Sequence, residues 1–131
     1  MFGLIGAARA ALRQVESARR ADGVYQLTHW PAVSAAATGD PRAAVVRLRV
    51  TQRLTAGFLD PVDDAIYLTA GLRRLGHRAS LHLGRELCPA APPAGVYPWV
   101  ECDGRVVSTS LPVAEEYVEV LRLPAAGAVA T

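Results

Sequence analysis

The sequence predicts an α+β fold in which two or three helices pack on a small antiparallel sheet. Segments with helical periodicity fill the first half of the chain, and two of them begin with an Asp-Pro pair. Short alternating segments fill the second half, where Asp103-Gly104 is a strong two-residue hairpin signal. With 131 residues, of which 51% are apolar, the chain is long enough to bury a core as a single domain.

The first two helices are expected in the N-terminal part of the chain. Residues 2–20 place apolar side chains on one helical face, and residues 24–37 are interpreted as a connector or short helix. Asp40-Pro41 predicts the second helix, because the aspartate can accept free amide hydrogens and proline fits the first helical position. This helix should run to about Ala56 and stop at the following glycine.

A third helix is expected over residues 61–75, because Asp60 and Pro61 repeat the same start signal. Asp63 and Asp64 fall in its first turn, where negative charge complements the helix dipole. Capping and dipole complementation on a solvated turn are a sufficient reason for these acids, and this interpretation is favoured over an acid–base role. The alternative, in which one of them has a raised pKa near the site, stays open.

Four strands should follow the third helix, at residues 78–84, 96–102, 105–109 and 117–123. The chain then divides into an N-terminal helix with its connector (1–40), a core (41–123) and a frayed tail (124–131).

A five-residue string opens the second expected strand: Tyr97-Pro98-Trp99-Val100-Glu101, followed by the hairpin turn. It resembles the His-Ala-Trp-Val-Glu hairpin of the lasso-peptide leader peptidases, which are transglutaminase-like cysteine proteases. The helix at 61–75, its closing glycine and the strand at 78–84 are similar to the layout of that family. The resemblance covers roughly Pro41 to Pro124 and implies a transglutaminase/papain-like core.

The resemblance places the family's catalytic positions on residues that cannot perform its reaction. Tyr97 stands at the histidine position, and a phenol with a pKa of about 10 cannot serve as both base and acid for a thiol protease near neutral pH. The family cysteine falls at Pro61, or at Asp60 if the register shifts by one, and its aspartate falls near Thr109. The resemblance therefore implies the scaffold without proteolysis.

A binding site is expected where these substituted positions meet, with the Pro-rich segment 88–95 as its rim. Tyr97 could donate a hydrogen bond to a developing oxyanion, or its ring could simply fill the space of an imidazole. Trp99 is favoured as a packing residue over a ligand platform. The candidate site comprises Tyr97, Asp60 and Asp64 as catalytic residues and Pro61, Trp99, Thr109 and His82 as substrate-binding residues.

The two cysteines, Cys88 and Cys102, make no disulfide framework and lack metal-ligand spacing. Reduced thiols in a cytoplasmic protein are expected, with no metal and no cofactor. Either cysteine could be a relocated nucleophile with His82 as its base, but a lone strand cysteine is more often a small buried apolar residue.

The charge pattern excludes several classes of function. All fourteen basic residues are arginines, so Schiff-base catalysis and a phosphate-loop lysine are excluded. A net charge of +2 without aromatic interleaving does not favour nucleic acid. No apolar run reaches the roughly 18 residues of a membrane span. Arg73, Arg74 and Arg78 cluster at one helix end, as a solvated face or as a docking patch for an acidic partner.

Three functions remain open at this point. The first is a repurposed protein of a bacterial specialised-metabolite pathway, which binds a small-molecule or peptide intermediate and promotes a cyclisation or related step. The second is a non-catalytic accessory that binds a peptide or a partner protein of the same pathway. The third is a cysteine hydrolase with a relocated thiol. The first is favoured, because polar residues occupy the positions where a catalyst would stand.

Overall fold

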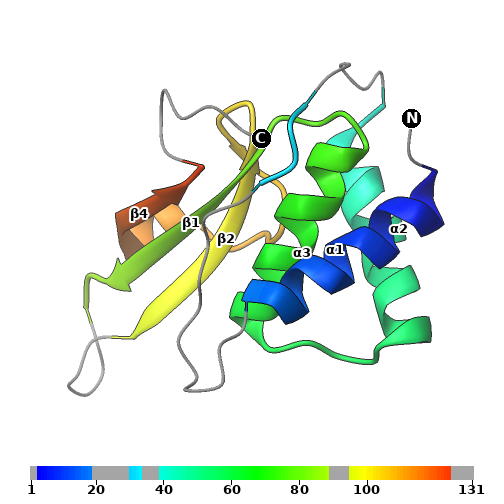
Figure 1. The fold of residues 1–131 in the computed structure, drawn as a ribbon. Coiled ribbons are helices and arrows are strands. Elements are labelled where there is room, and N and C mark those ends of the chain that lie inside the picture. The colour runs from blue at the N-terminus through cyan, green and yellow to red at the C-terminus, as the bar shows by residue number, and fades with distance from the viewer. Residues whose placement is uncertain (1–2, 19–29, 34–38, 89–94, 125–131) are drawn as a thin grey trace.

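The computed structural model describes residues 3–18, 30–33, 39–88 and 95–124. In this part of the chain it contains an antiparallel sheet of four strands, in the order β3-β2-β1-β4, and three long helices on one side of that sheet (Figure 1). The α+β class is confirmed. The elements are α1 (Leu4–Ala18), α2 (Pro41–Thr55), α3 (Pro61–Arg74), β1 (Ala79–Glu86), β2 (Val96–Cys102), β3 (Arg105–Val106), the single-turn helix α4 (Val113–Glu116) and β4 (Tyr117–Leu123).

The helix starts follow the predicted signals, with one correction. The side chain of Asp40 accepts a hydrogen bond from the amide of Arg42 at 3.1 Å, as predicted for the start of α2. Asp60 occupies the equivalent position before α3, but its side chain makes no capping hydrogen bond. Asp63 is completely buried, so the first turn of α3 is not the solvated turn that the sequence suggested.

The hairpin is confirmed, and the strand after it is shorter than predicted. Asp103 and Gly104 both have positive φ angles, 51° and 80°, which a tight two-residue turn between strands requires. Strand β3 ends at Val106 instead of residue 109, because the hydroxyl of Ser108 accepts the amide hydrogen of Val100 at 2.9 Å. A side chain thus takes the place that a backbone carbonyl would hold in a longer ladder.

The remaining elements show smaller differences. Strand β1 extends to Glu86, and α4 was not predicted. Residues 19–29, 34–38, 89–94 and 125–131, which include parts of the predicted first helix, its connector, the Pro-rich segment and the frayed tail, lie outside the described residues. No helix in the described ranges combines the length and apolarity that a membrane crossing requires.

The core lies between the sheet and the helices. Helix α3 makes the main helix contacts with β1 and β2, while α1 and α2 pack against α3. Fully buried Ile66 and Leu68 of α3 belong to one apolar cluster with Leu81 of β1 and Val100 of β2. The arginine cluster is only partly solvated, since half-buried Arg73 donates to the carbonyls of Pro31 and Ala79 at 2.6 and 3.0 Å. A docking patch at this helix end gains no support from that arrangement.

The buried phenol of Tyr67 leads to an expected pH dependence. Its hydroxyl donates to the carbonyl of Leu48 at 2.6 Å, and burial, followed by the charge of Asp64, raises its pKa to about 12. Burial, with the charge of Asp103, likewise raises the pKa of Cys102 to about 12. Both groups stabilise the fold in their neutral forms below their unfolded pKa values, and this stabilisation is lost as the pH rises toward 12.

We therefore expect the free energy of unfolding, measured by urea denaturation, to fall between about pH 8.5, the ordinary thiol pKa, and about pH 12. The chain has no lysine, so thiols and phenols are the side chains that titrate in this range. Tyr67→Phe should be less stable at pH 7, because it loses the hydrogen bond, but should lose less stability on the way to high pH. Parallel curves for the two proteins would contradict this assignment.

Candidate functional site

Strand β1 carries apolar side chains toward the helices and polar ones to the opposite side of the sheet, here called the outer face. Leu81 belongs to the core, so its neighbours Ser80 and His82 point to the outer face. In the antiparallel register His82 lies opposite Trp99, and Gly84 lies opposite Tyr97 on β2. The outer face therefore gathers residues from three strands: Ser80, His82, Gly84, Tyr97, Trp99, Glu101, Tyr117, Glu119 and Arg122.

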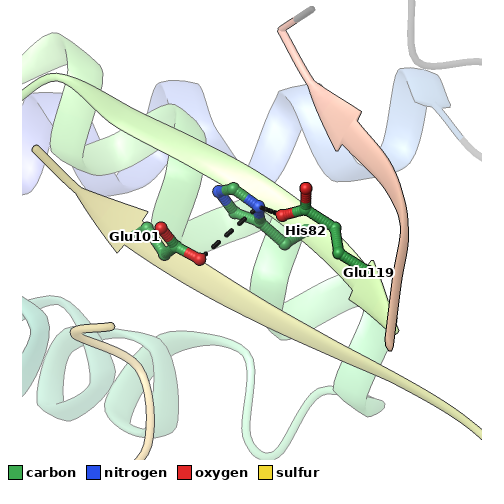
Figure 2. A group of neighbouring side chains, drawn as sticks. All are labelled: His82, Glu101 and Glu119. Atoms are coloured by element: carbon green, nitrogen blue, oxygen red, sulfur yellow. Dashed lines mark hydrogen bonds and ion pairs between the residues drawn. The ribbon is translucent and has the colours of Figure 1, made fainter. Parts of the chain in front are cut away.

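The centre of this face is the imidazole of His82, whose side chain is only 1% exposed. Its Nδ1 atom contacts a carboxylate oxygen of Glu119 and lies 3.6 Å from Oε2 of Glu101 (Figure 2). Its Nε2 atom lies 2.7 Å from the hydroxyl oxygen of Ser80. A buried imidazole with polar partners at both ring nitrogens is a satisfied group. We call His82, Glu101 and Glu119 the polar centre.

The sheet order explains how these three side chains meet. Strand β1 lies between β2 and β4, so a carboxylate from each neighbouring strand can reach the histidine in the middle. Glu101 lies opposite Ser80 and approaches diagonally from β2. On the other side, an irregularity in the pairing at Leu83 and Gly84 brings Glu119 opposite Gly84.

Each carboxylate of the polar centre has a second partner. The indole Nε1 of Trp99 donates to Oε2 of Glu101 at 2.8 Å, and Nη2 of Arg122 donates to Oε2 of Glu119 at 3.2 Å. Burial alone would raise the pKa of Glu119, but the hydrogen bond and charge of His82, together with Arg122, lower it below its ordinary value. Glu119 is therefore ionised at neutral pH.

Aromatic rings lie along one side of the polar centre. The ring of His82 stacks on Trp99 with centroids 5.8 Å apart, and Tyr97 stacks on Tyr117 at 5.3 Å. The ring centroids of Trp99 and Tyr117 are 6.4 Å apart, and this contact joins the two pairs into one row. Gly84 lies beneath the indole, where any side chain would collide with it. The outer face thus combines a row of aromatic rings, of which Trp99 is buried and Tyr97 and Tyr117 are half-buried, with a charged cluster. Many small-molecule sites have this composition.

The structure brings together some of the candidate residues predicted from the sequence. His82, Trp99 and Tyr97 share the outer face, with Tyr97 at the end nearer Tyr117. Thr109 lies in the loop after β3, where its hydroxyl accepts the amide hydrogen of Leu111 at 3.1 Å.

The acidic candidates have other surroundings. Asp64 accepts hydrogen bonds from Arg49 and Gln52 of α2, each at 2.9 Å, and Asp60 and Pro61 are exposed at the start of α3. Helix α3 packs on the core side of the sheet, whereas Tyr97 points to the outer face. The structure therefore does not bring these acids into contact with Tyr97.

Sequence reasoning missed Ser80, Glu101 and Glu119 as site residues. The alternation of β2 was a usable signal for Glu101, because it places this residue on the same face as Trp99. No local signal identified Glu119, because its place in the site depends on the pairing of β4 with β1, which the sequence alone did not predict.

The two thiols do not form a cysteine–histidine pair with His82. Cys102 points to the core side of the sheet and is buried, and its raised pKa keeps it a neutral thiol. Cys88 is exposed at the end of β1, beside an open pocket of about 330 Å³ lined by Glu86, Leu87, Cys88, Glu115, Glu116 and Tyr117.

Thiol labelling should distinguish the two cysteines. Cys88 should react with a thiol reagent such as Ellman's reagent in the native protein, while Cys102 should react only after unfolding in denaturant, because it is buried and protonated. The Cys88→Ser variant is the control, and its native form should show almost no labelling. Rapid labelling of Cys102 in the folded variant would contradict its placement in the core.

Comparison of the chain with protein-family models, with curated proteins and with solved structures found no match. The class that the fold and site define is an α+β protein with a buried imidazole–carboxylate centre on the face of its sheet that the long helices leave free.

Proposed function

We propose that this chain is a non-proteolytic, lasso-leader-peptidase-like protein of bacterial specialised-metabolite biosynthesis. It binds a biosynthetic intermediate on the outer face of its sheet and promotes a cyclisation or related step there. The polar centre carries the proposal, because imidazole and carboxylate groups held in contact are the groups that enzymes use to polarise substrates and move protons. The half-buried rings of Tyr97 and Tyr117 beside it offer an apolar surface for the rest of the intermediate.

Two observations support the loss of proteolysis. Cys102 lies on the opposite side of the sheet from His82, so the buried thiol has no access to that imidazole. Tyr97, at the position of the family histidine, stacks on Tyr117 and lies on the outer face. The described residues therefore contain no thiol in contact with an imidazole, the pair on which cysteine proteolysis depends.

A complementation experiment tests this function. We expect a producing strain that lacks this gene to accumulate an uncyclised intermediate, detected by mass spectrometry of culture extracts, and the wild-type gene to restore the product. His82→Ala should reduce product formation about a hundredfold, a typical effect of losing an acid–base group. His77→Ala is the matched control, because this half-buried histidine follows α3, away from the polar centre.

Two results would contradict the proposal. One is full product formation by a folded His82→Ala variant. The other is specific removal of a leader from a lasso-type precursor by the purified wild-type protein, since the proposal has no nucleophile for that reaction.

A second candidate, the non-catalytic accessory protein, is favoured by one observation. Val46, Val50 and Leu54 lie four residues apart on α2 and are 62%, 51% and 83% exposed, and Phe58 beyond the helix is 82% exposed. Such a row forms an apolar stripe on one helix face, of the kind that a partner helix covers. If this is the main role, Leu54→Asp should abolish product formation in the complementation experiment while His82→Ala leaves it unchanged.

A further inference from the structure

We propose that the polar centre binds one divalent cation of the zinc type, with His82, Glu101 and Glu119 as its protein ligands. Nδ1 of His82 and one carboxylate oxygen from each glutamate all lie within 4.8 Å of one another. Sequence spacing does not indicate such a site, because the three residues come from three different strands. The inference adds to the proposed function, which uses the same side chains, but cation binding does not require that function.

The distances fit shared coordination of one ion. Zinc lies about 2.0–2.2 Å from nitrogen and carboxylate oxygen ligands, so two ligands at a tetrahedral angle are about 3.4 Å apart. Nδ1 of His82 and Oε2 of Glu101 are separated by 3.6 Å, close to that value. Glu119 contacts Nδ1 directly and must turn slightly to share an ion with it. It is the most exposed of the three, at 33%, on an edge strand, so this adjustment disturbs little packing.

Each ligand also has the outer partner that metal ligands usually have. When Nδ1 of His82 exchanges its hydrogen bond to Glu119 for the ion, the hydroxyl of Ser80 is placed to accept a hydrogen from Nε2. Trp99 holds Glu101 by an indole hydrogen bond, and Arg122 holds Glu119. These contacts hold the imidazole and the Glu101 carboxylate in place before any ion binds, and Arg122 keeps the Glu119 carboxylate beside them.

Charge favours the same assignment. Two glutamates face one imidazole, and a doubly charged cation neutralises both carboxylates. One nitrogen and two oxygen ligands without a thiolate suit Zn²⁺ and Mn²⁺ better than the soft metals. Three protein ligands leave a further position on the ion, as in catalytic zinc sites. In the proposed function, an oxygen atom of the intermediate would bind the ion at that position, and the ion would polarise it.

Calorimetric titration of ZnCl₂ into the purified, chelator-treated protein tests the inference. The protein should carry Cys88→Ser, so that the exposed thiol does not compete for zinc. We expect one saturable site per chain with micromolar or tighter affinity, and a higher Tm with zinc present. His82→Ala and Glu119→Gln should weaken binding at least about tenfold, and Ser80→Ala should weaken it less, as expected for an outer partner.

His77→Ala and Glu116→Gln are the matched controls, since each removes a histidine or glutamate away from the centre, and both should bind zinc like the parent protein. Absence of saturable binding, or unchanged affinity in a folded His82→Ala variant, would overturn the inference. The outcome is distinguishable from that of the complementation experiment. Zinc binding without any metabolic effect of the gene would contradict only the proposed function, and an essential His82 without zinc binding would contradict only the cation site.

Discussion

Replacing Gly84 by alanine should lower the free energy of unfolding by about 3 kcal/mol, the upper part of the range for overpacked sites. A Cβ atom at this position would lie 2.4 and 2.7 Å from two ring carbons of Trp99 and 2.8 Å from Cβ of Tyr117. The Tyr117 atom is fixed to its strand and cannot rotate away. The indole is buried and anchored by its hydrogen bond to Glu101, so it too cannot move without loss.

Urea denaturation of Gly84→Ala and of the control Gly39→Ala would measure this effect. A Cβ at position 39 would meet only open space, and Gly39 has no positive φ, so its variant should change stability by less than about 0.5 kcal/mol. In a Trp99→Leu background the smaller side chain should relieve part of the collision, and Gly84→Ala should then cost less. Equal losses in both backgrounds would show that the indole is not the obstacle.

Leu48→Ala should cost about 2–5 kcal/mol, the usual range for deleting a fully buried leucine side chain. Leu48 is 0% exposed and joins α2 to α3, where its methyl groups lie over Gly71. The deletion would leave a cavity between the two helices. Val46→Ala, on the exposed side of the same helix, is the control and should change stability by less than about 0.5 kcal/mol.

A double-mutant cycle with Gly71 makes this prediction more specific. In the wild-type protein a Cβ at position 71 would lie 3.0 Å from Cδ2 of Leu48, which is tighter than ordinary contact. In the Leu48→Ala background that space is free, and alanine gains up to about 1 kcal/mol over glycine in a helix. Gly71→Ala should therefore stabilise the Leu48→Ala variant relative to its effect on wild type. Identical effects in the two backgrounds would contradict the packing described here.

Local sequence signals were enough to predict most of the fold. Proline after Asp40 and Asp60 marks two helix starts because its ring fits the first turn, and Asp103-Gly104 marks the hairpin because both residues tolerate positive φ angles. These features depend on neighbouring residues alone. The positions of α2 and α3 followed from them, and the apolar periodicity of the N-terminal segment predicted α1.

The site could not be predicted in the same way. Glu119 meets His82 only because β4 pairs with β1, a contact between residues 37 positions apart that no local pattern encodes. The resemblance drew attention to Tyr97 and to the start of α3, whereas sheet alternation turns Tyr97 away from that helix. The burial of Asp63 was not predicted either, because favourable interaction with the helix dipole already explained an acidic residue in the first turn of α3.

The edge position of β4 has a consequence for local opening of the native state. This strand pairs with β1 alone, and most of its side chains are exposed. Its detachment would remove Glu119 from the polar centre while leaving the contacts between α3, β1 and β2 intact. Edge segments with few buried contacts open at lower free energy than the core. Backbone amides of β4 should therefore exchange with deuterium faster than those of β1. The polar centre would then dissociate and form again through local opening of β4, without global unfolding.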